Sequence, residues 1–273
     1  MTAGTDPWLV ALDIDGTLVP EATADVSIET RAAVTAVRES GHEVVLATGR
    51  SLVGVVPVAR ALGLHDTWTV CSNGAVTARL DPTLAGGYEV TDALTFDAGP
   101  VAGLAWSLLT DIEIAAEETG VGYAVTSDFG PALNGTQNVV GLGELGRRRT
   151  ARLALRARGA AATLLDPIRS LGVTANPAGP DWVDVTPART SKAAALEIVR
   201  RRLGVAPTRV LALGDSHNDL PMFEWAARSV AMGGAPDVVR AAADETTGTL
   251  EEDGAATVLR RFLTVAAAEP VTS

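Results

Sequence analysis

The sequence has a single cysteine, few aromatic residues and a deficit of basic side chains. Of its 273 residues only Cys71 carries a thiol, and aromatic residues make up 4%. One cysteine excludes an intrachain disulfide, and Cys71, which follows the apolar stretch 68–70, is expected to be a small buried hydrophobe. The chain has 22 Lys and Arg against 33 Asp and Glu, a formal charge of −11. Because nucleic-acid binding is driven by clustered cations, this balance argues against a nucleic-acid partner.

Long hydrophobic runs are also missing. No stretch approaches the roughly 18 uninterrupted apolar residues that a membrane-spanning helix needs. Residues 1–7 contain neither a basic nor an apolar segment, so no secretory signal peptide is expected there. Apolar residues nevertheless make up 47% of the chain and charged residues 20%, which is typical of a globular protein. We expect a cytoplasmic protein without a membrane partner, and the sequence leaves open whether it is a monomer or a homodimer.

Short apolar runs alternate with helical periods in the first third of the chain and again near its end. Strands are expected at 8–12 and 44–47 and ending at 70–71, with helices at 27–40 and 52–64 between them. The later part predicts helices at 191–203, 220–227, 236–243 and 253–263, strands at 209–213 and 229–232, and a frayed tail at 265–273. This order predicts an α/β fold, a doubly wound parallel sheet with helices on both faces.

The middle of the chain has a different texture. It is rich in Gly and Pro turn signals, with a helical pattern at 101–109 and strand patterns at 123–126 and 152–157. We therefore expect residues 83–187 to form a separate α+β domain inserted into a core of residues 1–82 and 188–273.

Two acidic loops follow predicted strands. Asp13 and Asp15 come directly after the first strand, and Asp215 and Asp219 follow the strand at 209–213. Ligands of open parallel sheets bind beyond the carboxyl ends of the strands, so both loops are expected to face one crevice. Four carboxylates there would repel one another without a cation, and oxygen ligands suit Mg²⁺. Taken alone, the first loop is also compatible with a polar turn.

Two further positions offer groups that complement a phosphate. Thr48 and Gly49 follow the second strand and supply a hydroxyl and amides at the start of a helix. Lys192 lies in the first turn of its helix, where a cation opposes the helix dipole and requires an anionic partner. Thr48 as a helix cap and Lys192 as a surface residue are the alternatives.

These segments, in this order, resemble the four signature motifs of the haloacid dehalogenase (HAD) superfamily of phosphatases. The matching segments are Asp13-x-Asp15-Gly16-Thr17, Thr48, Lys192 and Gly214-Asp215-x-x-Asn218-Asp219. Residues 72–75 and 214–222 are most similar to the Cof-type subfamily, whose large cap domain is inserted after the third strand. The resemblance covers about residues 1–82 and 188–265 and recognises the cap only by position and size. Ala193, where the subfamily commonly has Gly, is a small departure.

The resemblance implies a Mg²⁺-dependent phosphatase that acts on small phosphorylated metabolites, sugar phosphates first, through an aspartyl-phosphate. Asp13 is implied as the nucleophile and Asp15 as the general acid and base. The implied Mg²⁺ ligands are Asp13, Asp15 through its backbone carbonyl, Asp215 and Asp219. The implied phosphate-binding residues are Thr48, Gly49, Lys192 and Asn218. Those on the substrate side are Asn73, Gly74 and Arg50, with a structural pairing as the alternative role of Arg50.

Three other functions stay open at this point. A phosphomutase or phosphotransferase such as phosphomannomutase would keep the chemistry and change the acceptor, and would yield an isomer in place of free phosphate. A signalling receiver domain also has Asp, Thr and Lys at strand ends, but it has no need for Asp15. A catalytically idle binding protein would lack a motif residue, and none is missing.

Some conspicuous residues are expected to be structural. The arginines at 147–149, 152, 156 and 158 are expected to form a solvated face, with an anionic substrate as the alternative. Trp106, Trp182 and Trp225 are expected to anchor a core or a domain interface. His217, beside the second acidic loop, is expected to orient or pack and not to ligate.

Overall fold

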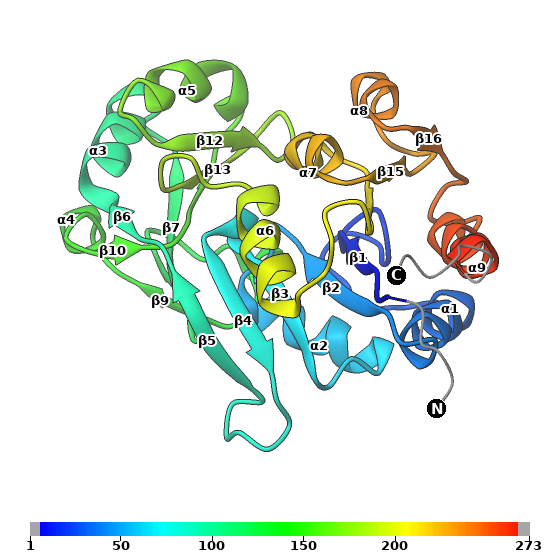
Figure 1. Cartoon of the computed structure of the whole chain (residues 1–273). Helices are drawn as coiled ribbons and strands as arrows, with labels where there is room; N and C mark the ends of the chain where they lie inside the picture. The colour runs from blue at the N-terminus through cyan, green and yellow to red at the C-terminus, as the bar shows by residue number, and fades with distance from the viewer. Residues whose placement is uncertain (1–5, 267–273) are drawn as a thin grey trace.

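The computed structural model describes residues 6–266, and within them the chain forms two large sheets (Figure 1). The larger sheet has the strand order β16-β15-β14-β1-β2-β3-β4-β5. Its strands are β1 (Leu9–Leu12), β2 (Glu43–Ala47), β3 (Thr67–Cys71), β4 (Val76–Leu80), β5 (Tyr88–Ala93), β14 (Val210–Gly214), β15 (Arg228–Ala231) and β16 (Glu245–Thr246).

The larger sheet is parallel from β16 to β3, as the sequence predicts, but its other edge is antiparallel. The pairings β3–β4 and β4–β5 are both antiparallel. The physical reason is the short connection, since β3 and β4 are joined only by the 3₁₀ turn η1 (Ser72–Gly74) and Ala75, too few residues for a parallel crossover. The expectation of a purely parallel sheet was therefore incomplete at this edge.

Helices cover both faces of the larger sheet. On one face Val10 and Leu12 of β1 pack in a core with α1 (Ile28–Glu39), α2 (Leu52–Leu62) and α9 (Gly254–Ala266). On the other face Leu9 and Ala11 pack with α6 (Lys192–Leu203), α7 (Leu220–Trp225) and α8 (Asp237–Ala242). Successive residues of a strand point to opposite faces, so a fully apolar run such as β1 belongs in a sheet covered on both sides. The doubly wound α/β architecture is confirmed.

Local sequence signals account for several helix ends. The Ser27 side chain accepts a hydrogen bond from Thr30 N and begins α1, and Ser191 does the same for Ala194 N in α6. Gly204 adopts a left-handed conformation directly after α6 and ends it.

The second sheet has six strands in the order β12-β13-β11-β7-β8-β9. They are β7 (Glu113–Glu118), β8 (Gly122–Val125), β9 (Thr136–Val139), β11 (Leu153–Arg156), β12 (Thr174–Pro177) and β13 (Trp182–Thr186). One face carries the helices α3 (Ala98–Leu108), α4 (Leu142–Leu145) and α5 (Ala160–Arg169). The strands β6 (Phe96–Asp97) and β10 (Arg149–Thr150) form a separate pair.

The proposed division at residues 82/83 and 187/188 stays a prediction. All strands of the six-stranded sheet lie inside 83–187. However, β5 (Tyr88–Ala93) lies beyond residue 82 and pairs with β4 of the larger sheet. A hairpin thus continues the larger sheet past the expected boundary.

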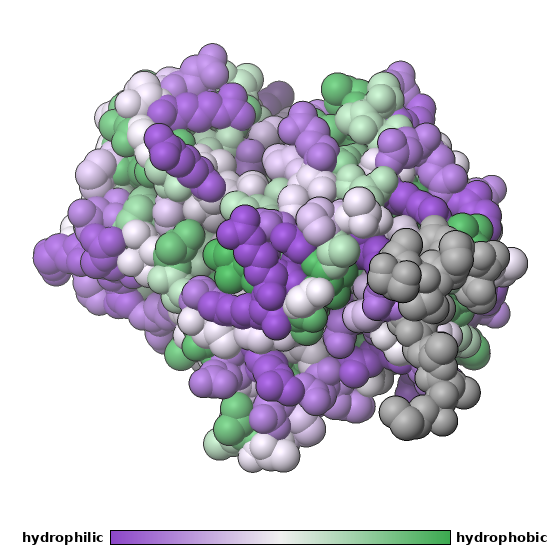
Figure 2. All heavy atoms as spheres, in the orientation of Figure 1, coloured by the Kyte–Doolittle hydropathy of each residue, from purple (hydrophilic) through white to green (hydrophobic). Residues whose placement is uncertain are grey.

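Trp106 lies at the surface and does not anchor a core, as was expected for it. Trp106 is 40% exposed, because the buried face of α3 is formed by Val101, Ala102 and Ala105. On the face drawn in Figure 2, hydrophobic residues stand in separate areas among hydrophilic ones.

None of the helices within residues 6–266 is both long and apolar enough to cross a membrane. Of the expected frayed tail, 265–266 belong to α9 and 267–273 lie outside the described residues, as do residues 1–5.

Candidate active site

Three neighbouring strands bring the predicted site residues together at the carboxyl ends of the parallel strands in the larger sheet. In the register of β14, β1 and β2, Leu12 lies opposite both Leu213 and Leu46. Asp13 follows Leu12 directly, and its backbone N–H donates to Leu213 O at 3.0 Å. The residues that follow β2 and β14 therefore emerge beside Asp13, as the rule for parallel sheets predicts.

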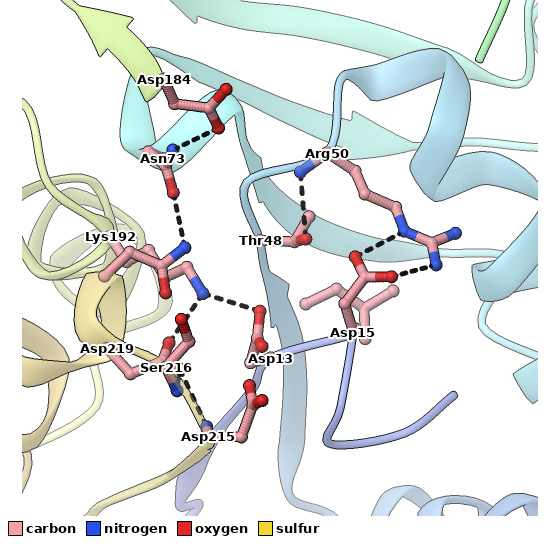
Figure 3. A network of polar contacts seen from close by, with 12 residues as sticks. Asp13, Asp15, Thr48, Arg50, Asn73, Asp184, Lys192, Asp215, Ser216 and Asp219 are labelled. Atoms are coloured by element: carbon pink, nitrogen blue, oxygen red, sulfur yellow. Dashed lines mark hydrogen bonds and ion pairs between the residues drawn. The ribbon is translucent and has the colours of Figure 1, made fainter. Parts of the chain in front are cut away.

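Lys192 joins the beginning of the chain to its far end. Its ammonium Nζ lies 2.6 Å from Asp13 Oδ1 and 2.6 Å from Asp219 Oδ1 (Figure 3). The lysine is fully buried. Burial alone lowers the pKa of Lys192, but the two carboxylates outweigh it and raise this pKa above its ordinary value. The cation at the start of α6 thus has anionic partners, as its position required.

Asp219 is a fully buried anchor. One oxygen accepts from Lys192, and the other accepts from the backbone N–H groups of Asp215 and Ser216, each at 3.0 Å. Both oxygens are therefore occupied by protein donors. This arrangement fixes the loop after β14 and leaves Asp219 about one lone-pair position, through which it could contact a metal ion directly or through a water.

Asp13 and Asp215 retain more carboxylate lone pairs for a metal ion than Asp219 does. Burial raises the pKa of Asp13 well above its ordinary value, although Lys192 lowers it, and Asp219 and Asp215 add to the rise. Burial and the neighbouring Asp219 raise the pKa of Asp215 to about 6. Asp215 Oδ1 is buried and has no hydrogen-bond partner. Ionised carboxylates that lie close together in one crevice repel one another, and a bound cation would reduce this repulsion.

The same carboxylates could hold a metal ion. One oxygen each from Asp13, Asp215 and Asp219 lie within 4.8 Å of one another. A set of carboxylate oxygens suits a hard divalent cation. The unpartnered buried oxygen of Asp215 supports this fit, because such an oxygen without a partner is costly. A divalent metal site is therefore compatible with the residues present.

Asp15 faces away from this cluster. Its carboxylate accepts from Arg50 Nη2 at 2.5 Å and Nε at 2.8 Å, and Figure 3 shows it turned toward Arg50. Arg50 also donates to Thr23 O at 2.7 Å. In this arrangement Arg50 is a structural partner of Asp15, one of the two roles that the sequence left open.

Thr48, Gly49 and Asn218 line the same cavity as Asp13. The Thr48 hydroxyl accepts from Arg50 N at 3.1 Å, a contact within the turn before α2. The cap residue of α2 is Ser51, so the alternative of Thr48 as a helix cap was wrong. Asn218 Nδ2 donates to Asn73 Oδ1 at 2.9 Å, whereas Asn218 Oδ1 is buried without a partner.

Asn73 and Gly74 are both buried, and they contact protein on several sides. Asn73 bridges Asn218 and, through Nδ2 at 3.3 Å, Asp184 Oδ2. Gly74 has φ +97°, and a Cβ there would lie 2.2 Å from Ser191 O. Glycine is therefore required where η1 passes the start of α6, which explains this residue without a substrate contact.

The cavity is closed on its other side by the six-stranded sheet. It has a volume of about 660 Å³ and is lined by Asp13 and Asp215 of the larger sheet and by Tyr123, Arg152 and Asp184 of the smaller one. Arg152 is 5% exposed, so its expected place on a solvated face was wrong. Its partners are Tyr123 OH, Asp184 and Glu117, which a local run of arginines does not reveal.

Strand alternation is the signal that could have found these residues. On β11, Leu153 and Leu155 pack under the helices, which places Arg152 and Ala154 on the opposite face. On β13, Val183 and Val185 pack with the helices in the same way, and Trp182 and Asp184 line the cavity. Polar residues that alternate with the apolar ones along a strand point to its other face, and they are candidates for a ligand-facing surface.

The comparisons with known proteins agree with this arrangement. The family model of haloacid dehalogenase-like hydrolases matches residues 10–85 and 162–259. The 5-amino-6-(5-phospho-D-ribitylamino)uracil phosphatase YcsE of Bacillus subtilis is 28% identical over 267 residues, 94% of this chain and 96% of its own. A phosphoglycolate phosphatase of Natronomonas pharaonis is 30% identical over 251 residues, 90% of this chain and 93% of its own.

Among solved structures, BT1666 from Bacteroides thetaiotaomicron superposes with a TM-score of 0.77. It is described among phosphatases of the HAD superfamily and is 26% identical to this chain. The superposition covers 97% of BT1666 and 96% of this chain. The fold and the strand-end site thus define a hydrolase with a doubly wound α/β core. The chain belongs to the haloacid dehalogenase-like hydrolases, of the Cof type, so the resemblance in its sequence is confirmed.

Proposed function

We propose that this protein is a Mg²⁺-dependent phosphatase that hydrolyses small phosphomonoesters through a phosphorylated Asp13. The carrying observation is the contact of 2.6 Å between the buried Asp13 carboxylate and Lys192, at the wall of a cavity of about 660 Å³. A carboxylate that is oriented by an ammonium and open to a pocket suits nucleophilic attack on phosphorus. Relatives with phosphatase names over most of their length support this proposal.

In the proposed reaction, an Asp13 oxygen attacks phosphorus and the bond from phosphorus to the leaving oxygen breaks. Asp15 gives its proton to that oxygen and then takes a proton from the water that hydrolyses the aspartyl-phosphate, which restores Asp13. For this, the Asp15 carboxyl has to turn from Arg50 toward Asp13. Lys192, Thr48, Gly49 and Asn218 would hold the phosphoryl oxygens.

Mg²⁺ would be held by Asp13, Asp215 and the backbone carbonyl of Asp15, with Asp219 acting through its hydrogen bonds or through water. When bound, the ion supplies positive charge that offsets the charge of the phosphoryl oxygens. The carboxylate donor set and the unpartnered Asp215 Oδ1 support this assignment.

We also propose that the segment 83–187 forms a cap domain over the active site. Residues 83–187 would cover the crevice and exclude bulk water, because the helix-free face of the six-stranded sheet contributes Tyr123, Arg152 and Asp184 to the cavity. A small phosphorylated metabolite, a sugar phosphate first, would bind between the sheets. A cytoplasmic location and a monomeric or homodimeric state remain proposals of the sequence.

The test is phosphate release from a panel of phosphomonoesters with Mg²⁺. Wild type should release phosphate, Asp13→Asn should lose about 10³-fold or more in turnover because the amide is not a nucleophile, and EDTA should silence wild type. Asp92→Asn is the matched control, since Asp92 pairs with Arg202 outside the cavity. Turnover of Asp13→Asn near that of wild type would contradict the nucleophile, and activity that survives chelation would contradict the metal. Formation of a phosphate isomer without free phosphate would indicate a mutase.

A further inference from the structure

A chain of hydrogen bonds joins the six-stranded sheet to Asn218. Asn73 Nδ2 donates to Asp184 Oδ2 at 3.3 Å, a contact drawn in Figure 3. Asn218 Nδ2 donates to Asn73 Oδ1 at 2.9 Å. Asn73 and Asp184 are both buried, and Asn218 lines the cavity. Since Asp184 belongs to β13, Asn73 links a carboxylate of the smaller sheet to a residue that follows β14 of the larger one.

Asp184 fixes the direction of each bond in this chain. Its carboxylate, which also accepts from Arg152 Nη1 at 3.2 Å, has no hydrogen to donate. Asn73 must therefore turn its Nδ2 toward Asp184 and its Oδ1 toward Asn218. Because an amide oxygen can only accept, Asn218 must in turn present its Nδ2 to Asn73. Both amides, whose ends are otherwise interchangeable in shape, are thus held in one orientation.

The backbone that carries Asn73 is fixed on the larger sheet. Asn73 N donates to Thr48 O at 3.0 Å, and Ser72 N donates to Arg50 O at 2.8 Å, so η1 lies against the turn after β2. Ser72 and Asn73 both have a left-handed backbone, with φ values of +50° and +55°. Asn is one of the few residues besides Gly that adopt this conformation readily. The Asn73 side chain therefore extends from a fixed backbone toward both of its partners.

The orientation of Asn218 decides which of its atoms meets a phosphoryl oxygen beside Gly49. A Cβ placed on Gly49 would lie 3.3 Å from Asn73 Oδ1 and 3.6 Å from Asn218 Nδ2, which comes nearer to that point than Asn218 Oδ1 does. One Nδ2 hydrogen is donated to Asn73, and the second remains for another acceptor. In the reverse orientation an amide oxygen would face the phosphoryl oxygens, and neither side would supply a hydrogen.

We infer that Asn73 is a positioning residue for phosphate binding. Held by Asp184 of the smaller sheet, it turns the Nδ2 group of Asn218 toward the phosphoryl group. A hydrogen bond to a charged oxygen is stronger than one between neutral groups, and an amide that is already oriented loses less freedom when it forms that bond. The phosphate site of the larger sheet is therefore complete only together with Asp184. This role rests on the proposed phosphatase function and adds a residue to its phosphate site.

The test is a double-mutant cycle on the affinity for inorganic phosphate, measured by calorimetry with Mg²⁺ present. Asn73→Gly suits the left-handed backbone and removes the amide, so it should weaken phosphate binding about fivefold. Asn218→Ala removes the donor itself and should weaken binding about tenfold. The double variant should bind within about twofold of Asn218→Ala, because Asn73 has nothing to orient once Asn218 cannot donate.

Ser72→Gly is the matched control. Ser72 has the same backbone conformation and donates to Glu117 Oε2 at 2.6 Å, so this variant also removes a contact between the two sheets. That contact does not lead to Asn218, and phosphate affinity should stay within about twofold of wild type. A loss in Ser72→Gly equal to that in Asn73→Gly would overturn the inference, because general loosening of the sheets would then explain both.

Additive losses, with the double variant about fiftyfold weaker than wild type, would also overturn the inference, as would unchanged affinity in Asn73→Gly. If Asn73→Gly does not fold, a crystal structure of wild type with Mg²⁺ and phosphate decides. The end of the Asn218 amide that contacts Asn73 should also contact a phosphate oxygen, and phosphate at the other end, or none at Asn218, would overturn the inference.

The binding cycle and the hydrolysis assay separate the two levels of the proposal. If the cycle shows the expected coupling but wild type hydrolyses no phosphomonoester, the role of Asn73 stands and the proposed function fails. If phosphomonoesters are hydrolysed but the losses in phosphate affinity are additive, the function stands and the role of Asn73 fails.

Discussion

At the scale of the residue, the site is a balance between one buried cation and the carboxylates around it. Lys192 neutralises part of the charge of Asp13 and Asp219, but Asp215 Oδ1 remains buried without a partner. The aspartates and Lys192 could be predicted from the sequence because each follows a strand or begins a helix at a recognisable loop. Arg152 could not, because its partners Tyr123 and Asp184 lie 29 and 32 residues away along the chain.

The raised pKa of Asp215 predicts a pH-dependent metal affinity. In the metal-free protein this carboxyl has a pKa of about 6, so it keeps its proton below that value and loses it above. A metal ion binds the ionised form, so affinity should rise with pH through this value and increase about tenfold between pH 5 and pH 7 for one released proton. Calorimetric titration with Mg²⁺ at the two pH values measures the change. Equal affinities at both would contradict a role for Asp215 as a ligand.

At the scale of the element, short loops at strand ends position the site. The hydrophobic pattern predicted the strands and helices of the larger sheet within a few residues, because each buries a continuous apolar stripe. The antiparallel edge, the two-residue strand β16 and most strands of the six-stranded sheet were missed. Those strands alternate apolar and polar residues over short stretches, and β9 (Thr136–Val139) is largely exposed, so little hydrophobic signal marks them.

The close approach of η1 to α6 predicts that Gly74→Ala is destabilising. The substitution places a Cβ 2.2 Å from the backbone oxygen of Ser191 at φ +97°. We expect a loss of about 2 kcal/mol or more in the free energy of unfolding, measured by urea denaturation. Gly103→Ala is the control, since its Cβ meets nothing within 4 Å in α3, and it should be neutral or stabilising by up to about 1 kcal/mol. Equal effects of both variants would refute the packing argument.

At the scale of the whole molecule, two sheets share one cavity. The larger sheet brings Asp13 from the start of the chain beside Lys192 and Asp215 from its last third, and the smaller sheet faces them with Asp184. The α/β class followed from the order of the elements. The continuation of the larger sheet into β5 did not, because strand pairing across a hairpin at residue 82 leaves no mark in composition.

The central claim is that Asp13 accepts a phosphoryl group while the residues from the far end of the chain surround it. The most direct test is a crystal structure of the protein with Mg²⁺ and beryllium fluoride, an analogue of a phosphorylated aspartate. We expect the fluoride adduct on an Asp13 oxygen, Mg²⁺ in contact with Asp13 and Asp215, and Lys192 within hydrogen-bond distance of the adduct. An adduct on another residue, or a metal ion that contacts neither Asp13 nor Asp215, would contradict the account.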